Sequence, residues 1–292
     1  MDIRKIFVVG SGLMGSGITQ VCAQAGYSVT MMDMDEAMIK KGMTSIGWSV
    51  AKLVDKGKAE GSPDEIIARI DTTSKLENAR DSDFVFEAIF ENPQVKGNVF
   101  SELDKICPER TILASNTSAI PITEIAEATK RPHKVVGTHF FSPVPMMRVV
   151  EIIKGLVTSD ETLETATKLC ESIGKEIVQV NRDVAGFVLN RLNAPATVEA
   201  IKLVESGVVS IDELDKGVRL GFGRPMGPFE TGDMAGLDVA LNAISAIYKE
   251  TGDIKFMPPV LLKRKVKAGH LGRKTGIGWY RYDENGKKLG PA

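Results

Sequence analysis

The sequence predicts an α/β fold, with a doubly wound, mostly parallel sheet followed by a smaller all-helical domain. Two observations support this prediction. Up to about residue 180, short apolar runs alternate with segments of helical character, and after about residue 183 the pattern changes to helices alone. Because strands that alternate with helices form parallel crossover units, we expect helices on both faces of the sheet.

The runs expected to be strands are rich in aliphatic and aromatic residues. They are 6–9, 27–32, 83–88, 111–114, 134–138, 149–153 and 176–180. The later, helical part includes an apolar stripe with helical spacing, formed by Leu237, Leu241, Ile244 and Tyr248. We therefore place a domain boundary near residue 184, so that residues 1–184 form the sheet domain and residues 185–292 the helical domain.

Composition excludes some partners. The 292 residues carry 37 basic and 38 acidic side chains, a balance that provides no overall field for nucleic acid or an anionic membrane. No apolar stretch approaches the length of a bilayer span, and we expect a cytoplasmic protein. The cysteines Cys22, Cys107 and Cys170 are too far apart for a disulfide framework or a metal site. We expect them to be buried packing residues, and we expect no metal.

The most informative stretch is a glycine motif directly after the first strand. The apolar run Ile6–Val9 breaks into Gly10-Ser11-Gly12-Leu13-Met14-Gly15. Gly10 allows a tight turn, Gly12 lets backbone N–H groups approach a pyrophosphate, and Gly15 lets the next helix pack on the sheet. Glycines cluster in many strand-to-helix turns, but here the whole context of a Rossmann-type dinucleotide site is present. We expect the cofactor to contact Gly10, Gly12, Leu13, Met14 and Gly15.

The second strand ends at a carboxylate. Asp33 follows Tyr27–Met32, at the position where an acidic side chain accepts hydrogen bonds from the adenine ribose. A carboxylate there would repel a 2′-phosphate. The sequence therefore predicts NAD as the cofactor, with NADP disfavoured.

Few histidines are available as a general base. His133 follows a proline in a polar turn, and His270 lies in a Lys- and Gly-rich segment. His139 instead ends the run Val135–Thr138, at the carboxyl edge of a predicted strand, where open α/β sheets bind ligands. Position therefore favours His139.

A buried carboxylate is a potential partner for this histidine. Glu151 interrupts the aliphatic run 149–153, and a carboxylate among aliphatic residues is costly to bury without a partner. Residues 140–145 could turn the chain and bring Glu151 back to His139. A Glu on one imidazole nitrogen would leave the other to exchange a substrate proton. The alternative is an edge-strand glutamate that points to water.

Small polar residues follow another strand, in Ala114-Ser115-Asn116-Thr117-Ser118. Pro121 and Glu124 indicate that a helix begins soon afterwards. Thr117 or Ser118 fits a helix cap as well as it fits a catalytic role.

Several long motifs in one order resemble the short-chain L-3-hydroxyacyl-CoA dehydrogenases, and in particular the bacterial 3-hydroxybutyryl-CoA dehydrogenases. The resemblance covers essentially the whole chain. The motifs are 114–118, His139-Phe140-Phe141-Ser142-Pro143 with Glu151, Gly186-Phe187-Val188-Leu189-Asn190-Arg191 and Gly272-Arg273-Lys274-Thr275-Gly276. The family implies reversible, NAD(H)-dependent oxidation of a short 3-hydroxyacyl-CoA, such as (S)-3-hydroxybutyryl-CoA, to the 3-ketoacyl-CoA in butyrate or fatty-acid metabolism.

The resemblance also implies residue roles. His139 would be the general acid/base with Glu151 as its partner, while Ser118 and Asn190 would hydrogen-bond the reacting oxygen. Since Asn190 lies beyond the domain boundary, domain closure would complete the site. Cofactor contacts would include Glu91, Lys96 and Asn116. Coenzyme A contacts carry over to Ser49 and Lys56, with Lys52 as a neighbouring candidate; for each lysine, a solvated helix face is an equal alternative.

Two positions depart from the family pattern. Ser142 stands where asparagine is usual, so a hydrogen bond to substrate would have a different reach. Ala185 stands where proline is common, which we expect to affect only the interdomain hinge.

Two other functions stay open on sequence alone. One is a related hydroxyacid or sugar-acid dehydrogenase that needs no CoA, which free 3-hydroxybutyrate would reveal as a substrate. The other is a non-catalytic nicotinamide-binding protein, because a fold alone does not establish catalysis. The wide apolar faces of the helical domain favour a homodimer through that domain, and the alternative is that they form an ordinary small core and the interface between the domains.

Overall fold

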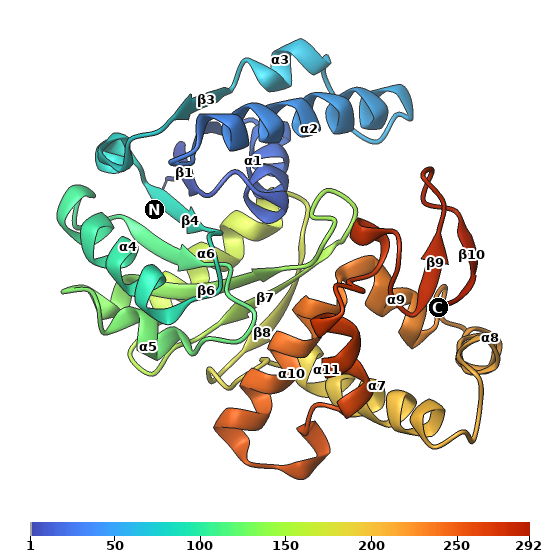
Figure 1. Cartoon of the computed structure of the whole chain (residues 1–292). Coiled ribbons are helices and arrows are strands. Elements are labelled where there is room, and N and C mark those ends of the chain that lie inside the picture. Colours follow the sequence, from blue (N-terminus) through green and yellow to red (C-terminus); the bar gives the residue numbers. More distant parts are fainter. Residues whose placement is uncertain (1) are drawn as a thin grey trace. The chain divides into compact units, whose positions relative to one another are not determined.

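The computed structural model describes residues 2–292 and divides the chain into two compact units, Met1–Val184 and Ala185–Ala292. The first unit contains the large sheet and the helices that flank it, and the second unit is mainly helical (Figure 1). Each unit has its own cluster of buried apolar side chains.

The first unit is built on an eight-stranded sheet in the order β3-β2-β1-β4-β5-β6-β7-β8. All neighbouring strands are parallel except β6 and β7, which are antiparallel. The strands are β1 (Lys5–Val9), β2 (Ser28–Met32), β3 (Ile70–Thr73), β4 (Phe84–Glu87), β5 (Ile112–Ser115), β6 (Val135–Phe140), β7 (Val149–Ile153) and β8 (Glu176–Val180). The predicted doubly wound, mostly parallel sheet is confirmed.

Helices flank this sheet on both sides (Figure 1). They are α1 (Leu13–Gln24), α2 (Glu36–Asp55), α3 (Pro63–Ile67), α4 (Pro93–Ile106), α5 (Ile122–Ala126) and α6 (Asp160–Ser172), with short 3₁₀ turns at Leu76–Asp81 and Pro132–Lys134. The chain order reverses direction between β1 and β4. Ligands of open α/β sheets bind beyond the carboxyl ends of the strands at such a reversal.

The core explains why the strands are continuous apolar runs. Both faces of a central parallel strand are covered by helices, so successive residues are buried rather than alternate ones. In β1, residues 6–9 are at most 2% exposed. Similar burial holds for β4 and β5. A carboxylate buried within such a strand therefore needs hydrogen-bond or ionic partners.

The second unit is helical, as predicted, except for a short antiparallel hairpin that the sequence reasoning omitted. Its elements are α7 (Leu189–Glu205), α8 (Ile211–Phe222), α9 (Pro228–Ala235), α10 (Leu237–Thr251), α11 (Val260–Lys267), the 3₁₀ turns Ile254–Phe256 and Arg273–Thr275, β9 (Tyr280–Tyr282) and β10 (Lys288–Pro291). The predicted stripe lies on α10 and packs into this unit's core.

Two buried aspartates tie the hairpin to the helices. Asp215 accepts hydrogen bonds from the first backbone N–H groups of α9 and from the Tyr280 hydroxyl, and Asp233 accepts them from the backbone of residues 279 and 280 and from the Tyr282 hydroxyl. The two carboxylates, on α8 and α9, therefore join these helices to the hairpin strand β9.

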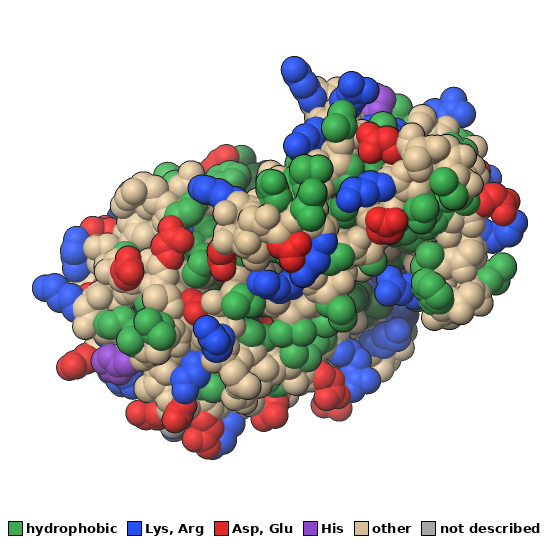
Figure 2. Space-filling view, turned by 90° about the horizontal axis from the view of Figure 1, so that it is seen from below, with side chains coloured by type: hydrophobic (Ala, Val, Ile, Leu, Met, Phe, Trp, Pro, Cys, Tyr) green, Lys and Arg blue, Asp and Glu red, His purple; other side chains and the backbone are tan. Residues whose placement is uncertain are grey.

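The cysteines and the surface agree with the composition. Cys22, Cys107 and Cys170 are buried free thiols, as predicted. No helix within residues 2–292 is both long and apolar enough to cross a membrane. Figure 2 shows basic and acidic side chains interspersed over most of the face in view, consistent with the net charge of −1.

Candidate active site

The loop after β1 has a geometry that only glycine tolerates at two positions. Gly10 has φ +103°, and a Cβ there would lie 2.5 Å from the Ala88 carbonyl oxygen. A Cβ on Gly15 would lie 1.8 Å from the Gly10 carbonyl oxygen. Gly12 differs, since a Cβ would meet nothing within 4 Å. The space beside Gly12 and the N-terminus of α1 therefore fit a diphosphate that approaches the backbone.

The other predicted loop contacts begin α1. Leu13 is 71% exposed, and Met14 is partly buried against the sheet core. A large exposed apolar side chain at the start of this helix is consistent with a surface that a ligand covers.

Asp33 is fastened to the glycine loop. One of its carboxylate oxygens accepts hydrogen bonds from the Ser11 backbone N–H, at 2.9 Å, and from the Ser11 hydroxyl, at 2.8 Å. The sequence reasoning had assigned Asp33 only to a ribose. The structure adds that this carboxylate holds the loop in place, so the loop and the expected ribose contact share one side chain.

His139 and Glu151 form a cross-strand pair. The two residues are register partners on β6 and β7, and the His139 Nδ1 lies 2.7 Å from a carboxylate oxygen of Glu151. Glu151 has no exposed surface, and His139 is 5% exposed. Since β7 lies between β6 and β8, Glu151 does not point from an edge strand to water. The Phe141 ring packs beside the imidazole, with 4.5 Å between ring centroids.

The polar loop after β5 reaches the same edge of the sheet. The Asn116 side-chain oxygen accepts a hydrogen bond from the Phe140 backbone N–H, one residue beyond His139. The Thr117 hydroxyl accepts from the backbone of Ile120, as in a local cap. Asn116 thus connects this loop to the end of β6, and Thr117 shapes the turn that carries Ser118.

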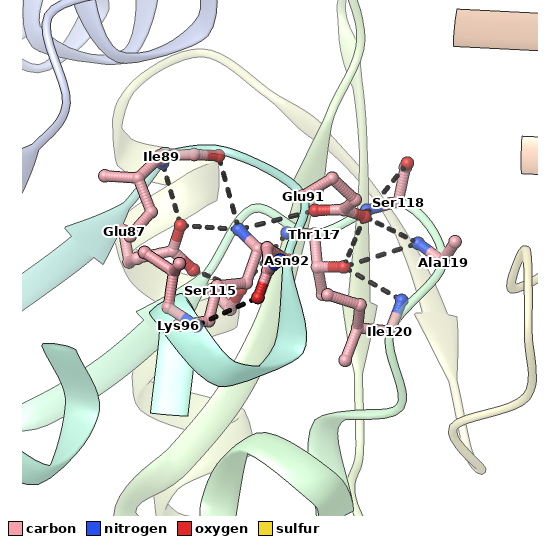
Figure 3. A network of polar contacts seen from close by, with 11 residues as sticks. Glu87, Ile89, Glu91, Asn92, Lys96, Ser115, Thr117, Ser118, Ala119 and Ile120 are labelled. Carbon is pink, nitrogen blue, oxygen red and sulfur yellow. Dashed lines mark hydrogen bonds and ion pairs between the residues drawn. The ribbon is translucent and has the colours of Figure 1, made fainter. Parts of the chain in front are cut away.

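Glu91 fastens that turn (Figure 3). One of its oxygens accepts hydrogen bonds from the Thr117 hydroxyl, at 2.6 Å, and from the backbone N–H groups of Ser118 and Ala119, at 2.8 and 3.1 Å. The Lys96 Nζ lies 3.4 Å from its other oxygen. Burial raises the pKa of Glu91, but the charge of Lys96 and these hydrogen bonds outweigh burial and hold the pKa below its ordinary value.

The residues carried over for coenzyme A lie on or just after α2. Ser49 is half-buried, Lys52 is exposed, and Lys56 is exposed at the residue after the helix. The Lys52 Nζ lies 4.5 Å from the centroid of the exposed Trp48 ring. Ser49, Lys52 and Lys56 are spaced three or four residues apart, so they share one helix face.

Three further residues were singled out by sequence. Ser142 is exposed in the loop after β6, and its peptide bond to Pro143 is cis. Asn190 lies in the first turn of α7, in the second unit, so its predicted part in the site stays a prediction. Ala185 is buried at the start of that unit.

The sequence reasoning missed Glu87. This carboxylate ends β4 and has no exposed surface. The signal that identified Glu151, an acid within an apolar strand, was present here as well, in Phe84-Val85-Phe86-Glu87. Glu87 contacts Lys96, which also lies 3.4 Å from Glu91 (Figure 3).

Two family models together match nearly the whole chain. The model of the 3-hydroxyacyl-CoA dehydrogenase NAD binding domain matches residues 5–184, and that of the 3-hydroxyacyl-CoA dehydrogenase C-terminal domain matches residues 186–282.

Individual relatives match along nearly their whole length. A probable 3-hydroxybutyryl-CoA dehydrogenase of Bacillus subtilis is 45% identical, over 97% of this chain and 99% of its own. The 3-hydroxybutyryl-CoA dehydrogenase of Clostridioides difficile is 44% identical, over 96% and 100%. Among solved structures, the (S)-3-hydroxybutyryl-CoA dehydrogenase of Ralstonia eutropha has a TM-score of 0.91 at 39% identity, over 97% and 100%. The chain therefore belongs to the 3-hydroxyacyl-CoA dehydrogenase family.

Proposed function

We propose that the protein catalyses the reversible, NAD(H)-dependent oxidation of (S)-3-hydroxybutyryl-CoA to acetoacetyl-CoA. The observation that carries this proposal is the buried His139–Glu151 pair, which lies at the same sheet edge as the glycine loop after β1. Membership of the family and the names of its relatives support the choice of a short acyl-CoA as substrate.

In this proposal His139 moves the substrate proton. The Glu151 carboxylate accepts a hydrogen bond from Nδ1, which fixes the ring orientation and stabilises the imidazolium. Nε2 then removes the C3 hydroxyl proton in the oxidative direction and returns a proton in reduction. NAD held at the glycine loop and Asp33 would supply the acceptor for the hydride from C3.

Ser118, together with the predicted Asn190, would hydrogen-bond the oxygen on C3. Glu91 holds the turn that carries Ser118 through backbone hydrogen bonds, and the Ser118 hydroxyl donates to the same Glu91 oxygen at 3.3 Å. The hydroxyl is therefore held in place before substrate arrives, and its proton would turn from Glu91 to the oxygen on C3. Donors held in advance stabilise a developing oxyanion without reorganisation during the reaction. Asn116, bonded to the end of β6, would keep the Ser118 loop next to His139.

NAD binding would use the open space beside Gly12, the neighbouring Leu13 and Met14, and Asp33. Coenzyme A would lie along α2 with its anionic nucleotide near Lys52 and Lys56 and its chain near Ser49. Both assignments follow the chemistry of the groups, because a carboxylate accepts from ribose hydroxyls and ammonium groups attract phosphates.

We also infer a homodimer through the second unit and a cytoplasmic location. The dimer is supported by large apolar side chains that are exposed on α7 and α8, Leu192, Leu220 and Phe222, at 74%, 78% and 77%. The location is supported by the three cysteines, which are buried and form no disulfide among the described residues.

The decisive experiment follows the loss of NADH absorbance with acetoacetyl-CoA, with NADPH in parallel and free acetoacetate as the substrate control. We expect fast oxidation of NADH with the thioester alone, and His139→Ala should bind NADH normally but turn over poorly. Equal activity with free acetoacetate would replace this proposal with a dehydrogenase that needs no CoA. NADH binding without turnover of any substrate would reject catalysis.

A further inference from the structure

Glu87 receives three hydrogen bonds from three different segments of the chain. One oxygen accepts from the Lys96 Nζ at 2.6 Å and from the Ile89 backbone N–H at 2.8 Å, and the other accepts from the Ser115 hydroxyl at 2.6 Å. Glu87 and Ser115 have no exposed surface, and Lys96 is 1% exposed. A single carboxylate therefore joins the end of β4, the end of β5 and helix α4 (Figure 3).

An ion pair at this depth is a costly way to join three segments. Removing both charges from water costs several kcal/mol per ion in proteins, and well-packed apolar side chains of similar volume are often as stable. The pair is tolerable because the Glu87 oxygens have well-placed donors. Stability alone does not explain why this site contains a charge pair rather than apolar side chains, so a second role is worth seeking.

The Lys96 ammonium links Glu87 to the turn that carries Ser118. Lys96 lies 2.6 Å from Glu87 and 3.4 Å from Glu91, so the lysine is shared by one fully buried carboxylate and one that is 35% exposed. Glu91 in turn accepts hydrogen bonds from the backbone N–H groups of residues 118 and 119 and from the Thr117 hydroxyl. The contacts therefore run without a gap from Glu87 to Lys96, to Glu91 and to the turn.

We propose that Glu87 is a positioning residue, which holds the Lys96 ammonium against Glu91 and so fixes the turn that presents the Ser118 hydroxyl. This inference rests on the role proposed above for Ser118. Without the Glu87 charge, the buried ammonium loses its nearest anion, Glu91 loses its fixed cation, and the turn at 117–119 loses the carboxylate position on which its hydrogen bonds depend.

Glu87→Gln tests this proposal in protein free of cofactor. The amide keeps the size of the side chain but removes its charge. We expect amide hydrogen exchange at Ser118 and Ala119 to become at least tenfold faster, because Glu91 holds the N–H groups of these two residues. Unchanged exchange there would overturn the proposal.

Asp104→Asn is the matched control. Asp104 is a buried carboxylate on α4 that pairs with Arg131 at 2.7 Å and accepts from the Lys130 backbone N–H, so its hydrogen bonds go to residues other than Glu87, Lys96 and Glu91. This variant should lower the melting temperature to a similar extent while leaving exchange at 117–119 and turnover within about twofold of the wild type. If Asp104→Asn accelerates exchange at 117–119 as much as Glu87→Gln does, the effect is general loosening and the proposal fails.

Turnover supplies the second readout, as a double-mutant cycle with Ser118→Ala. We expect Glu87→Gln to lower kcat at least tenfold in the parent and less than twofold in the Ser118→Ala background, because its effect passes through Ser118. Equal losses in both backgrounds would overturn the proposal. If Glu87→Gln does not fold, Glu87→Asp keeps the charge but draws it away from the Lys96 ammonium by one methylene group. The same double-mutant cycle then applies, with a smaller loss of kcat expected.

Separate measurements distinguish failure of this inference from failure of the proposed function. Wild-type turnover of acetoacetyl-CoA with NADH tests the function, and Ser118→Ala alone tests the role of that serine. The exchange measurement needs no substrate, so it reports on the contact from Glu87 to the turn even if another substrate is the true one.

Discussion

Glu151 lies directly opposite His139 across the antiparallel strands β6 and β7, with its carboxylate 2.7 Å from the imidazole Nδ1. This is the sheet's only change of strand direction among the described residues. Parallel strands would have needed a long crossover between the two residues, whereas the turn at 141–148 brings them together within twelve positions. The reversal of β7 is therefore what allows the pair to form.

Glu151→Gln should lower kcat by about 10²–10⁴-fold, the range that general acid–base catalysis contributes. The amide can still hydrogen-bond Nδ1, but it no longer stabilises a positive imidazolium, and its N–H group favours the wrong tautomer. NADH affinity, measured by fluorescence, should stay within about twofold. Glu176→Gln, which removes an exposed partner of Arg148 from the same sheet, serves as the control and should leave kcat unchanged. A full-rate Glu151→Gln enzyme would remove the pair from the mechanism.

The contact between His139 and Glu151 could be predicted in outline because side chains in strands alternate with a period of two. Once the chain reverses, that period decides which residues share a face. The strands themselves were predicted to within one or two residues because buried parallel strands are continuous apolar runs. Strand β3 was missed because only Ile70 of its four residues is buried, so it has no such run.

Contacts that depend on how loops approach one another could not be predicted from the sequence. The bonds from Ser11 to Asp33, and from the turn at 117–119 to Glu91, join segments more than twenty residues apart in the chain. Nothing in local pattern or spacing specifies them. Glu87 itself could be recognised as an acid within an apolar strand, but its partners Lys96 and Ser115 could not be predicted, because only the fold brings them to it.

Asp33→Asn should shift cofactor preference towards NADPH. Removing the negative charge relieves its repulsion of a 2′-phosphate, so the ratio of kcat/KM for NADPH to that for NADH should rise at least tenfold. Activity with NADH should also fall, because the Ser11 backbone and hydroxyl lose a charged acceptor.

The control for this change is Asp35→Asn, which removes a carboxylate two residues away that caps α2. Its cofactor ratio should stay within about twofold of the wild type. Parallel initial rates with NADH and NADPH measure both variants. An unchanged ratio in Asp33→Asn would show that another residue sets the preference.

Lys52→Gln combined with Lys56→Gln should raise KM for acetoacetyl-CoA about tenfold and leave kcat unchanged, as expected when binding common to ground state and transition state is lost. Glutamine avoids placing an anion at the C-terminal end of α2, where the helix dipole would oppose it. Acetoacetyl-pantetheine lacks the nucleotide and should show the same KM with both enzymes. Lys105→Gln, on α4, is the control. An equal rise in KM for both thioesters would argue against a nucleotide contact.

Phe222→Asp should convert the proposed dimer to a monomer. The Phe222 ring is 77% exposed at the end of α8, and a carboxylate in an apolar interface is costly to desolvate. Size-exclusion chromatography with light scattering measures the mass. Leu156→Asp, at an equally exposed position in the first unit, should leave the mass unchanged. A wild-type chain of one-protomer mass at micromolar concentration would reject the dimer directly.

Glu230 should make the second unit sensitive to acid. Its carboxylate is 8% exposed and accepts hydrogen bonds from Lys288, Arg219 and the Gly227 backbone. Burial raises its pKa, but these hydrogen bonds outweigh burial and lower the pKa from 4.5 to about 2. A folded-state pKa below the unfolded value means that the stabilisation is complete above pH 4.5 and is lost as the pH falls towards 2.

Glu230→Gln should therefore lower the free energy of unfolding at pH 7 by about 1–2 kcal/mol, a range reduced for the partial exposure of Arg219 and Lys288. The difference between wild type and variant should shrink as the pH is lowered below 4.5, because the Glu230 carboxyl of the unfolded wild type takes up a proton there while that of the folded protein stays ionised. Urea denaturation between pH 3 and pH 7 measures it. Glu213→Gln, which removes an exposed partner of Lys216, should change stability by less than about 0.5 kcal/mol at every pH. A constant difference for Glu230→Gln across the range would mean that packing, rather than charge, accounts for its contribution.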